Sequence, residues 1–220
     1  PWPPGQFAER LPLVRQWLSR TFRPDQRALI KATSFVSDIA GDLMGGTRKT
    51  VFLTLKPERY LQTILAGDNS RQELGALSGT RLQRLNARLD NDGFTLWELD
   101  EATRAAMAWA CEMTALETAA DSNTLWVDFD YFLKAPAQTL KSIADHLEVV
   151  LSAEQAQALV NSPIMQRYSK APEHGYSPQL REDVLAKAAS ERGGDIRAAL
   201  QWLENAGKAH PAIAAALARA

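Results

Sequence analysis

The residues best placed for chemistry stand where apolar segments end. Lys31 closes the apolar segment 27–32, while Asp128 and Asp130 stand at the end of the apolar segment 124–128. Ligands of open α/β sheets bind at the carboxyl ends of strands, so a charged residue at such an end is a candidate for a binding role. The two aspartates could bind Mg²⁺, as at the end of a Walker-B strand, or could cap the helix that follows.

A second concentration of polar groups lies in the segment 168–177. Hydrogen-bonding and cationic side chains gather in and just before it: Arg167, Tyr168, Ser169, Lys170, His174, Tyr176 and Ser177. The segment has neither helical nor strand periodicity, which predicts irregular structure. It is interpreted either as a solvent-exposed loop or as part of a binding site.

The segment 50–67 predicts the element around which the others are arranged. Residues 50–55 are mostly apolar and lack polar alternation, which is typical of a strand buried on both faces. Pro57 suits the first turn of a helix, Glu58 is favourable near a helix N-terminus, and Gly67 can end the helix. The segment therefore predicts a buried strand, a tight turn and a helix.

The segments 27–32 and 124–128 also predict buried strands, each followed by a helical pattern. Strands that alternate with helices favour right-handed crossovers and a parallel sheet. We therefore expect a helix-rich, three-layer α/β sandwich with a short parallel sheet of at least three strands. Further helices are expected over residues 7–22, 35–43, 68–92 with a loosely ordered start, 99–120, 136–147, 151–161, 178–192 and 196–206.

The composition of the chain limits the kinds of partner and cellular environment that it fits. A formal net charge of −1 over 220 residues gives no strong field for recruiting nucleic acid or an acidic membrane surface. No apolar run approaches the length of a membrane span. The single cysteine, Cys111, favours a reducing, cytoplasmic environment over a disulfide framework. Oligomerisation is left open.

The segment 50–67 resembles the second phosphate-binding segment of the sulfotransferase family. In that family a strand ends in Arg-x-Pro, and a Ser or Thr follows six residues after the Pro. The Arg and the hydroxyl hold the 3′-phosphate of 3′-phosphoadenosine 5′-phosphosulfate. Pro57 and Thr63 match this pattern, whereas Leu55 stands in place of the Arg and Lys56 lies one position later. The resemblance implies that Lys56 and Thr63 bind the donor.

The segment 124–147 carries the longer resemblance. Sulfotransferases commonly run from a strand through Tyr-Glu-Asp-Leu and a short Pro-containing loop into a helix patterned Leu-x-x-Ile-x-x-Phe-Leu. This chain reads Phe-Asp-Tyr-Phe at 129–132, Lys-Ala-Pro at 134–136 and Leu-x-x-Ile-x-x-His-Leu at 140–147. Most of these are packing positions. The resemblance therefore implies a fold of the P-loop nucleotide-hydrolase type, and we interpret His146 as structural.

The resemblance also implies roles at the two polar sites. A sulfotransferase strand often ends Lys-Thr-Pro-His, where the Lys neutralises charge and the His deprotonates the acceptor. This chain has Lys-Ala-Thr-Ser at 31–34, so Lys31 is kept and the His is replaced by Ser34. A serine cannot take a proton unaided at neutral pH. Lys170 is expected to contact phosphate, and His174 is the candidate for the missing base.

The function implied is transfer of a sulfonate from 3′-phosphoadenosine 5′-phosphosulfate to a hydroxyl or amine of a small molecule, glycan or lipid. Sulfonyl transfer needs no metal, so we expect none and favour capping roles for Asp128 and Asp130. No phosphate-binding loop occurs in the sequence, so this loop and the family's first strand are expected to precede Pro1. Residues 1–220 then form one domain, with a helical extension at 178–220.

Two other functions remain open. One is a catalytically inactive binding module that holds a partner on the helical surface after Leu99. The other is a relative of the P-loop kinases, which would need a metal-binding aspartate such as Asp128. Preference for adenosine 3′,5′-bisphosphate over ATP would separate the transferase from the kinase relative.

Overall fold

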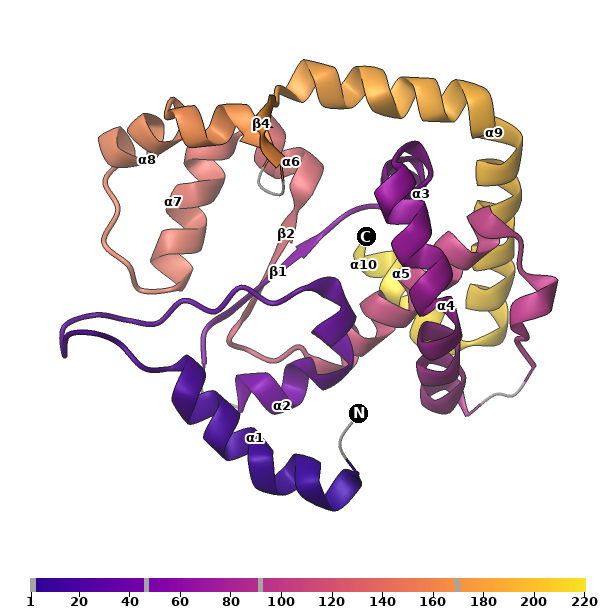
Figure 1. The fold of residues 1–220 in the computed structure, drawn as a ribbon, viewed down its shortest axis with the longest axis horizontal. Coiled ribbons are helices and arrows are strands. Elements are labelled where there is room, and N and C mark those ends of the chain that lie inside the picture. The colour runs from indigo at the N-terminus through magenta and orange to yellow at the C-terminus, as the bar shows by residue number, and fades with distance from the viewer. Residues whose placement is uncertain (1–2, 46–47, 91–92, 169–170) are drawn as a thin grey trace.

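The computed structural model describes residues 3–45, 48–90, 93–168 and 171–220 (Figure 1). The α-helices are α1 (Pro4–Leu18), α2 (Ala40–Met44), α3 (Pro57–Ala66), α4 (Asp68–Leu89), α5 (Glu101–Ala119), α6 (Phe129–Lys134), α7 (Pro136–His146), α8 (Ala153–Val160), α9 (Pro178–Ala209) and α10 (Pro211–Arg219). The strands are β1 (Thr50–Thr54), β2 (Thr124–Asp128), β3 (Arg167–Tyr168) and β4 (Ala171–Gly175). The 3-10 helices are η1 (Ser34–Ile39), η2 (Leu96–Glu98) and η3 (Pro163–Gln166).

The parallel sheet joins β1 to β2. The two strands pair in register, with Thr50 opposite Thr124 and Thr54 opposite Asp128. β1 runs into α3 and β2 runs into α6, so both connections leave the same edge of the sheet (Figure 1). The predicted α/β class is confirmed in its coarse form, because a helix-rich chain surrounds a small parallel sheet.

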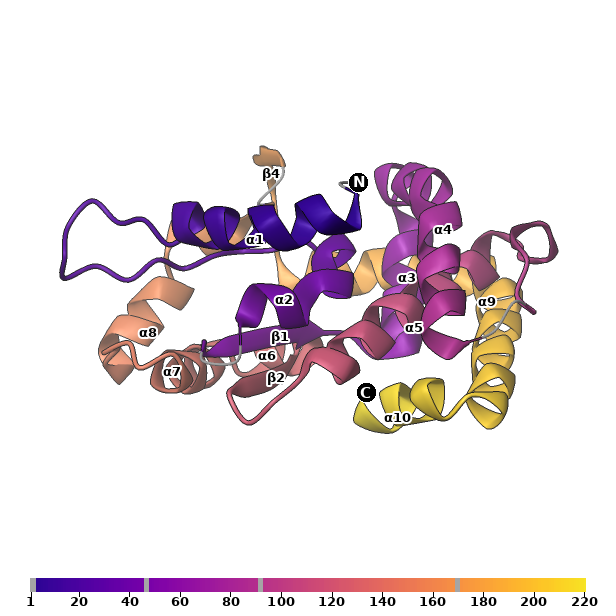
Figure 2. The same ribbon diagram turned by 90° about the horizontal axis from the view of Figure 1, so that it is seen from below.

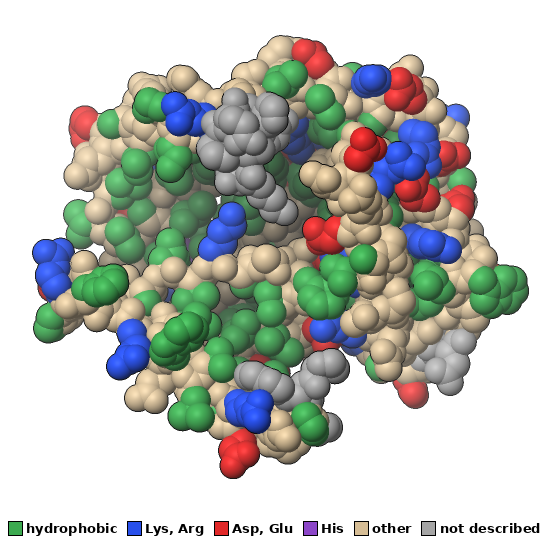
Figure 3. Space-filling model, in the orientation of Figure 1, with side chains coloured by type: hydrophobic (Ala, Val, Ile, Leu, Met, Phe, Trp, Pro, Cys, Tyr) green, Lys and Arg blue, Asp and Glu red, His purple; other side chains and the backbone are tan. Residues whose placement is uncertain are grey.

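The prediction of a third strand at 27–32 is wrong. Within the described residues, this segment forms no ladder with β1 or β2. Leu29 is 82% exposed and Ile30 is 46% exposed, so the apolar run that suggested burial faces solvent. Figure 3 shows further apolar side chains on the same side of the molecule, over α7 and α8. A short apolar run does not distinguish a buried strand from an exposed connection.

Side chains from distant segments hold the sheet in place. His146 Nε2 lies 3.0 Å from the carbonyl oxygens of both Thr50 and Asn123, at the start of each strand. The Trp109 indole donates a hydrogen bond of 2.9 Å to the carbonyl of Leu55, just beyond the end of β1. His146 therefore has the structural role expected of it.

A small core covers one face of the strand pair. Ala40 and Met44 of α2 pack with Phe52 of β1. Figure 2 shows α1 and α2 on this side of the sheet. The Phe52 ring meets the Trp126 ring of β2 edge-on, with 5.1 Å between centroids.

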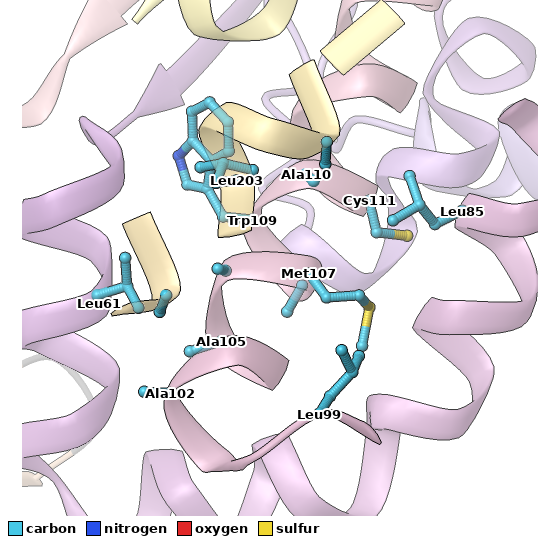
Figure 4. Packing of buried hydrophobic residues seen from close by; sticks show 14 of the residues in the cluster. Leu61, Leu85, Leu99, Ala102, Ala105, Met107, Trp109, Ala110, Cys111 and Leu203 are labelled. Atoms are coloured by element: carbon cyan, nitrogen blue, oxygen red, sulfur yellow. The ribbon is translucent and has the colours of Figure 1, made fainter. Parts of the chain in front are cut away.

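The main core is built around α5, against which α3, α4, α9 and α10 pack (Figures 1 and 2). Residues 105–115 of α5 are all buried, so this helix buries every face and not only the single apolar face that its periodicity predicted. Its many alanines let neighbouring helices approach closely. Figure 4 shows the larger side chains Met107 and Trp109 among them, with Leu203 of α9 nearby.

The C-terminal helices share this core. Leu203 of α9 and Ile213 of α10 are almost completely buried in it. The predicted helices 178–192 and 196–206 are joined in α9 with a kink between them, where Arg192 has non-helical backbone angles (φ −120°, ψ 15°). Arg192 pairs with Glu101 at 3.1 Å and with Asp195 at 2.7 Å, which fixes the kink against the start of α5.

Among the described residues, none of the helices has the length and apolar character that crossing a bilayer requires.

Candidate functional site

The predicted donor-binding residues Lys56 and Thr63 are carried by a single helix. Lys56 occupies the N-cap position of α3 and is exposed, and Thr63 lies two turns further on and is half-buried. The Thr63 hydroxyl donates a hydrogen bond of 2.7 Å to the carbonyl of Arg59 in its own helix. The hydroxyl hydrogen of Thr63 is therefore already used in this bond. The side chain must rotate before it can donate a hydrogen bond to a phosphate oxygen.

The other predicted site residues lie apart from α3 in the sequence. Lys31 is exposed in the irregular segment before η1, three residues before Ser34. His174 belongs to β4, but its side chain lies outside what the structure describes. Lys170 lies outside the described residues. The convergence of Lys31, Thr63 and Lys170 on one crevice remains a prediction.

A charged cluster joins the segments that leave the sheet. Arg59 of α3 donates to Asp130 of α6 with Nε 2.9 Å from Oδ2, and its Nη2 pairs with Glu182 of α9. Arg181 of α9 contacts the other oxygen of Asp130 at 2.8 Å. Two arginines and two carboxylates have no net charge, so the cluster acts mainly as a brace that holds α3, α6 and α9 together.

The predicted capping role of Asp128 is confirmed. Its side chain accepts a hydrogen bond of 2.7 Å from the backbone N–H of Tyr131 and caps the N-terminus of α6. Asp130 is instead held between the two arginines. Within the described part of the chain, no group of three or more His, Cys, Asp and Glu side chains is arranged to hold a metal ion.

A small polar pocket opens between η1, α3 and α4. Its volume is about 180 Å³. The lining residues are Ser34, Tyr60, Ile64, Ser70, Glu73, Leu74 and Arg81. Pockets that enclose drug-sized ligands have volumes of roughly 300–1,000 Å³, so this one has room for a small group and not for a whole nucleotide.

A buried ion pair supports the wall of the pocket. Arg81 of α4 is 4% exposed and Glu112 of α5 is 7% exposed. Arg81 Nε and Nη2 lie 2.9 Å and 2.7 Å from the same carboxylate oxygen, Oε1 of Glu112. Arg81 also lines the pocket, so its guanidinium connects the pocket wall with the carboxylate buried behind it.

Burial changes the acidity of two groups at this site. Loss of solvent raises the pKa of Glu112 above its ordinary value, although the charge and the hydrogen bonds of the nearby Arg81 act to lower it. Burial also raises the pKa of the Tyr60 phenol, and the charge of Glu112 adds to this effect. Tyr60 is therefore neutral at physiological pH and can donate a hydrogen bond.

The two faces of α3 have different surroundings. Arg59, one turn before Thr63, reaches the charged cluster with α6 and α9, whereas Tyr60 and Ile64 line the pocket beside α4. Residues 59 and 63 share one face of the helix, and residues 60 and 64 share the adjacent face. Thr63 and the pocket-lining residues Tyr60 and Ile64 thus lie on adjacent faces of the same helix.

Sequence reasoning missed Glu112, Arg81 and the role of Ser34 in the pocket. Glu112 stands between Cys111 and Met113 in an otherwise apolar part of α5, and a lone charge in such a segment is the signal that could have identified it. Its partner Arg81 is 31 residues away, so no local spacing predicts the pair. Cys111 is a buried free thiol, and burial raises its pKa, which disfavours the reactive thiolate.

Comparison of the chain with protein-family models, with curated proteins and with solved structures found no match.

Proposed function

We propose that this chain is a sulfotransferase-like protein that transfers a sulfonate from 3′-phosphoadenosine 5′-phosphosulfate to an acceptor hydroxyl or amine. The observation that carries the proposal is the parallel pairing of β1 with β2. The two segments that resemble the family, 50–67 and 124–147, are distant in sequence, and this pairing places their strands side by side. Their following helices begin at the same edge of the sheet, where α/β proteins bind ligands.

The donor end of the proposed site lies at the start of α3. Lys56 is exposed there, and the first amides of a helix that begins with Pro57 favour an anion. Thr63 would supply a hydroxyl after turning from the Arg59 carbonyl. Lys31 and Lys170 would add positive charge to the leaving phosphate. Catalysis would rest on positioning and charge neutralisation, as in phosphoryl transfer.

The acceptor end of the proposed site is the small pocket beside α3. Ser34, which stands where the family has its catalytic histidine, lines this pocket. The pocket is too small for the donor nucleotide but has room for the reacting group of an acceptor. The proposal includes a three-layer P-loop type of fold and a cytoplasmic location, for which the single reduced cysteine is favourable.

Calorimetric titration of the purified chain with adenosine 3′,5′-bisphosphate tests the proposal, with ATP as the comparison ligand. We expect the bisphosphate to bind more tightly than ATP. Lys56→Ala and Thr63→Val should each raise its Kd by about tenfold, because each removes a contact to a charged phosphate. Lys187→Ala is the matched control, since Lys187 is an exposed lysine of α9 that pairs only loosely with Glu191 at 3.8 Å.

Two results would contradict the proposal. Preferential binding of ATP would favour a relative of the P-loop kinases. Binding of neither nucleotide would favour a catalytically inactive binding module.

A further inference from the structure

We propose that residues 4–31, which are α1 and most of the connection after it, form a docking surface for a membrane with anionic headgroups. The whole chain has a formal charge of −1, but this charge is unevenly distributed. Residues 4–31 contain six basic and two acidic residues, a formal charge of +4, whereas the rest of the chain carries −5. A basic segment on an otherwise acidic chain turns that side of the molecule toward an acidic surface. The inference does not depend on the proposed function.

The outer side of α1 carries large apolar side chains. Leu11 is buried against the protein, whereas Leu13 is exposed and Trp17 is 68% exposed. Residues 13 and 17 are one turn apart and share a face of the helix. This face lies away from Leu11, because successive helical residues are turned by about 100°. α1 therefore presents to solvent apolar groups that the protein core does not use.

The connection after α1 continues the docking surface. Figures 1 and 2 show it reaching the edge of the molecule before it returns to η1. Phe22 is fully exposed on it, and Leu29 is exposed as well. Arg27 donates hydrogen bonds to the carbonyls of Leu147 and Glu148, at 3.3 Å and 3.2 Å. These bonds hold the connection against the end of α7, so its apolar side chains stand on a fixed support.

Exposed arginines stand among these apolar side chains. Arg20 and Arg23 lie on either side of Phe22 in the sequence, and both are exposed. Arg23 pairs with Asp25 at 3.6 Å, but both side chains are mostly exposed, so the pair is weak. Figure 3 shows basic and apolar side chains interspersed over α1 and the connection. This mixture matches an anionic bilayer surface, where apolar groups enter the acyl boundary and arginines meet the headgroups.

The form of the docking surface favours a membrane over a macromolecular partner. Phe22 is fully exposed on an extended connection, so a protein partner would have to supply the pocket that receives it. Leu13 and Leu29 cannot stack on bases as the aromatic residues of single-strand-binding proteins do. A bilayer interface accepts aromatic and aliphatic groups without fixed positions, and it supplies the negative charge that the six basic residues complement.

Co-sedimentation of the purified chain with vesicles tests the proposal. The vesicles are phosphatidylcholine alone, or phosphatidylcholine with about 30% phosphatidylserine, each in about 0.1 M and about 1 M salt. We expect binding to the anionic vesicles at the lower salt concentration. Most of this binding should be lost at the higher salt concentration and on vesicles of phosphatidylcholine alone, because the attraction is partly electrostatic.

Two kinds of variant remove the two kinds of contact. Trp17→Ser and Phe22→Ser should each weaken vesicle binding by about tenfold, since each loses a large apolar group that enters the interface. Arg20→Ala combined with Arg23→Ala should weaken it by about tenfold or more, because each basic residue near an anionic leaflet adds to the attraction. All four residues are exposed, so these variants should keep the stability of the unmutated chain.

Matched controls change similar residues outside the docking surface. Trp97→Ser removes another exposed tryptophan, which lies in η2. Lys187→Ala combined with Arg197→Ala removes two exposed basic residues of α9. Both controls should bind the anionic vesicles as tightly as the unmutated chain does.

Tryptophan fluorescence tests whether Trp17 enters the interface. The emission of the unmutated chain should shift to shorter wavelength when anionic vesicles are added, because an indole ring leaves water for the headgroup boundary. Trp17→Phe should abolish this shift while keeping most of the binding. Trp97→Phe should retain the shift.

The outcomes decide between a membrane and other occupants. Absence of binding to anionic vesicles, equal binding to phosphatidylcholine alone, unchanged binding by the variants, or a shift that Trp17→Phe retains overturns the proposal. Tighter binding to oligothymidylate than to vesicles overturns it in favour of a single-stranded nucleic acid. A dimer in sedimentation velocity that Phe22→Ser dissociates overturns it in favour of a second copy of the chain. The proposed sulfonate transfer is tested separately, by nucleotide binding.

Discussion

At the residue scale, the most informative group is Glu112. It is a charged side chain in the middle of an apolar helix, and it is paired with Arg81. A carboxylate buried in this way costs free energy unless its partners are well placed. The protein retains it beside a pocket, which is the arrangement that suggests use in chemistry.

The raised pKa of Glu112 predicts a pH dependence of stability. A carboxyl whose folded pKa is raised stabilises the fold fully below its unfolded pKa of about 4.3, and this contribution is lost as pH rises through the folded pKa. Denaturant titrations between pH 4 and pH 8 should show the free energy of unfolding falling with pH in the unmutated chain relative to Glu112→Gln. Equal slopes for the unmutated chain and Glu112→Gln would contradict the assignment.

At the element scale, several helices could be predicted because their signals are local. Asp100 caps α5 by accepting a hydrogen bond of 2.7 Å from the N–H of Thr103. Ser152 caps α8 in a capping box with Gln155. Pro57 begins α3 as expected. These features depend on residues within one turn of each other, which is why the sequence alone reveals them.

The candidate site could be predicted only in part because its contacts are not local. The sequence indicated α3 with Lys56 and Thr63, but it did not indicate that Arg81 would pair with Glu112, 31 residues further along the chain. That contact depends on how α4 packs against α5. The strand prediction for residues 27–32 was wrong for a related reason. An apolar run is buried in a sheet only if another strand pairs with it, and none does among the described residues.

The start of α5 links three helices through Glu101. It pairs with Arg71 of α4 at 2.8 Å and with Arg192 at the kink of α9 at 3.1 Å. The hydrogen bond from Arg71 lowers the pKa of Glu101, against the effect of burial, and Arg192 adds to the lowering. The kink of α9 is therefore held by a charge on another helix.

Glu101→Gln should destabilise the protein in a pH-dependent way. A carboxyl with a lowered folded pKa contributes stability above its unfolded pKa of about 4.3, and this contribution is lost as pH falls through the folded pKa. Glu101 is about one-third exposed, so the cost near pH 7 should be up to about 1 kcal/mol in denaturant titrations. Glu191→Gln, in an exposed pair on α9, is the control, and a cost for Glu101→Gln that persists at pH 2 would contradict the ionic origin.

At the scale of the whole molecule, the stabilising core is helical and the sheet is small. The buried cluster of α3, α4, α5, α9 and α10 contains Leu203, which is 1% exposed. The described parallel sheet contributes Phe52 and Val127 as its buried apolar residues. A two-stranded sheet is marginal by itself, so packing against helices must keep β1 and β2 paired.

A pair of leucine substitutions tests this distribution of stability. Leu203→Ala should cost about 2–5 kcal/mol of unfolding free energy because it opens a cavity in the helical core. Leu29→Ser should change stability by less than about 0.5 kcal/mol, because Leu29 is 82% exposed. Denaturant titrations compare the two variants directly. A cost for Leu29→Ser as large as that for Leu203→Ala would mean that residues 27–32 form a buried strand after all.

We propose that the chain binds a 3′-phosphoadenosine nucleotide at the edge of the sheet where β1 ends. Hydrogen–deuterium exchange with and without adenosine 3′,5′-bisphosphate tests this proposal most directly. We expect slower exchange in peptides covering residues 56–63, where the first amides of α3 would meet a phosphate. ATP at the same concentration should protect these peptides less. Unchanged exchange at 56–63, or equal protection by ATP, would contradict the proposal that this protein is sulfotransferase-like.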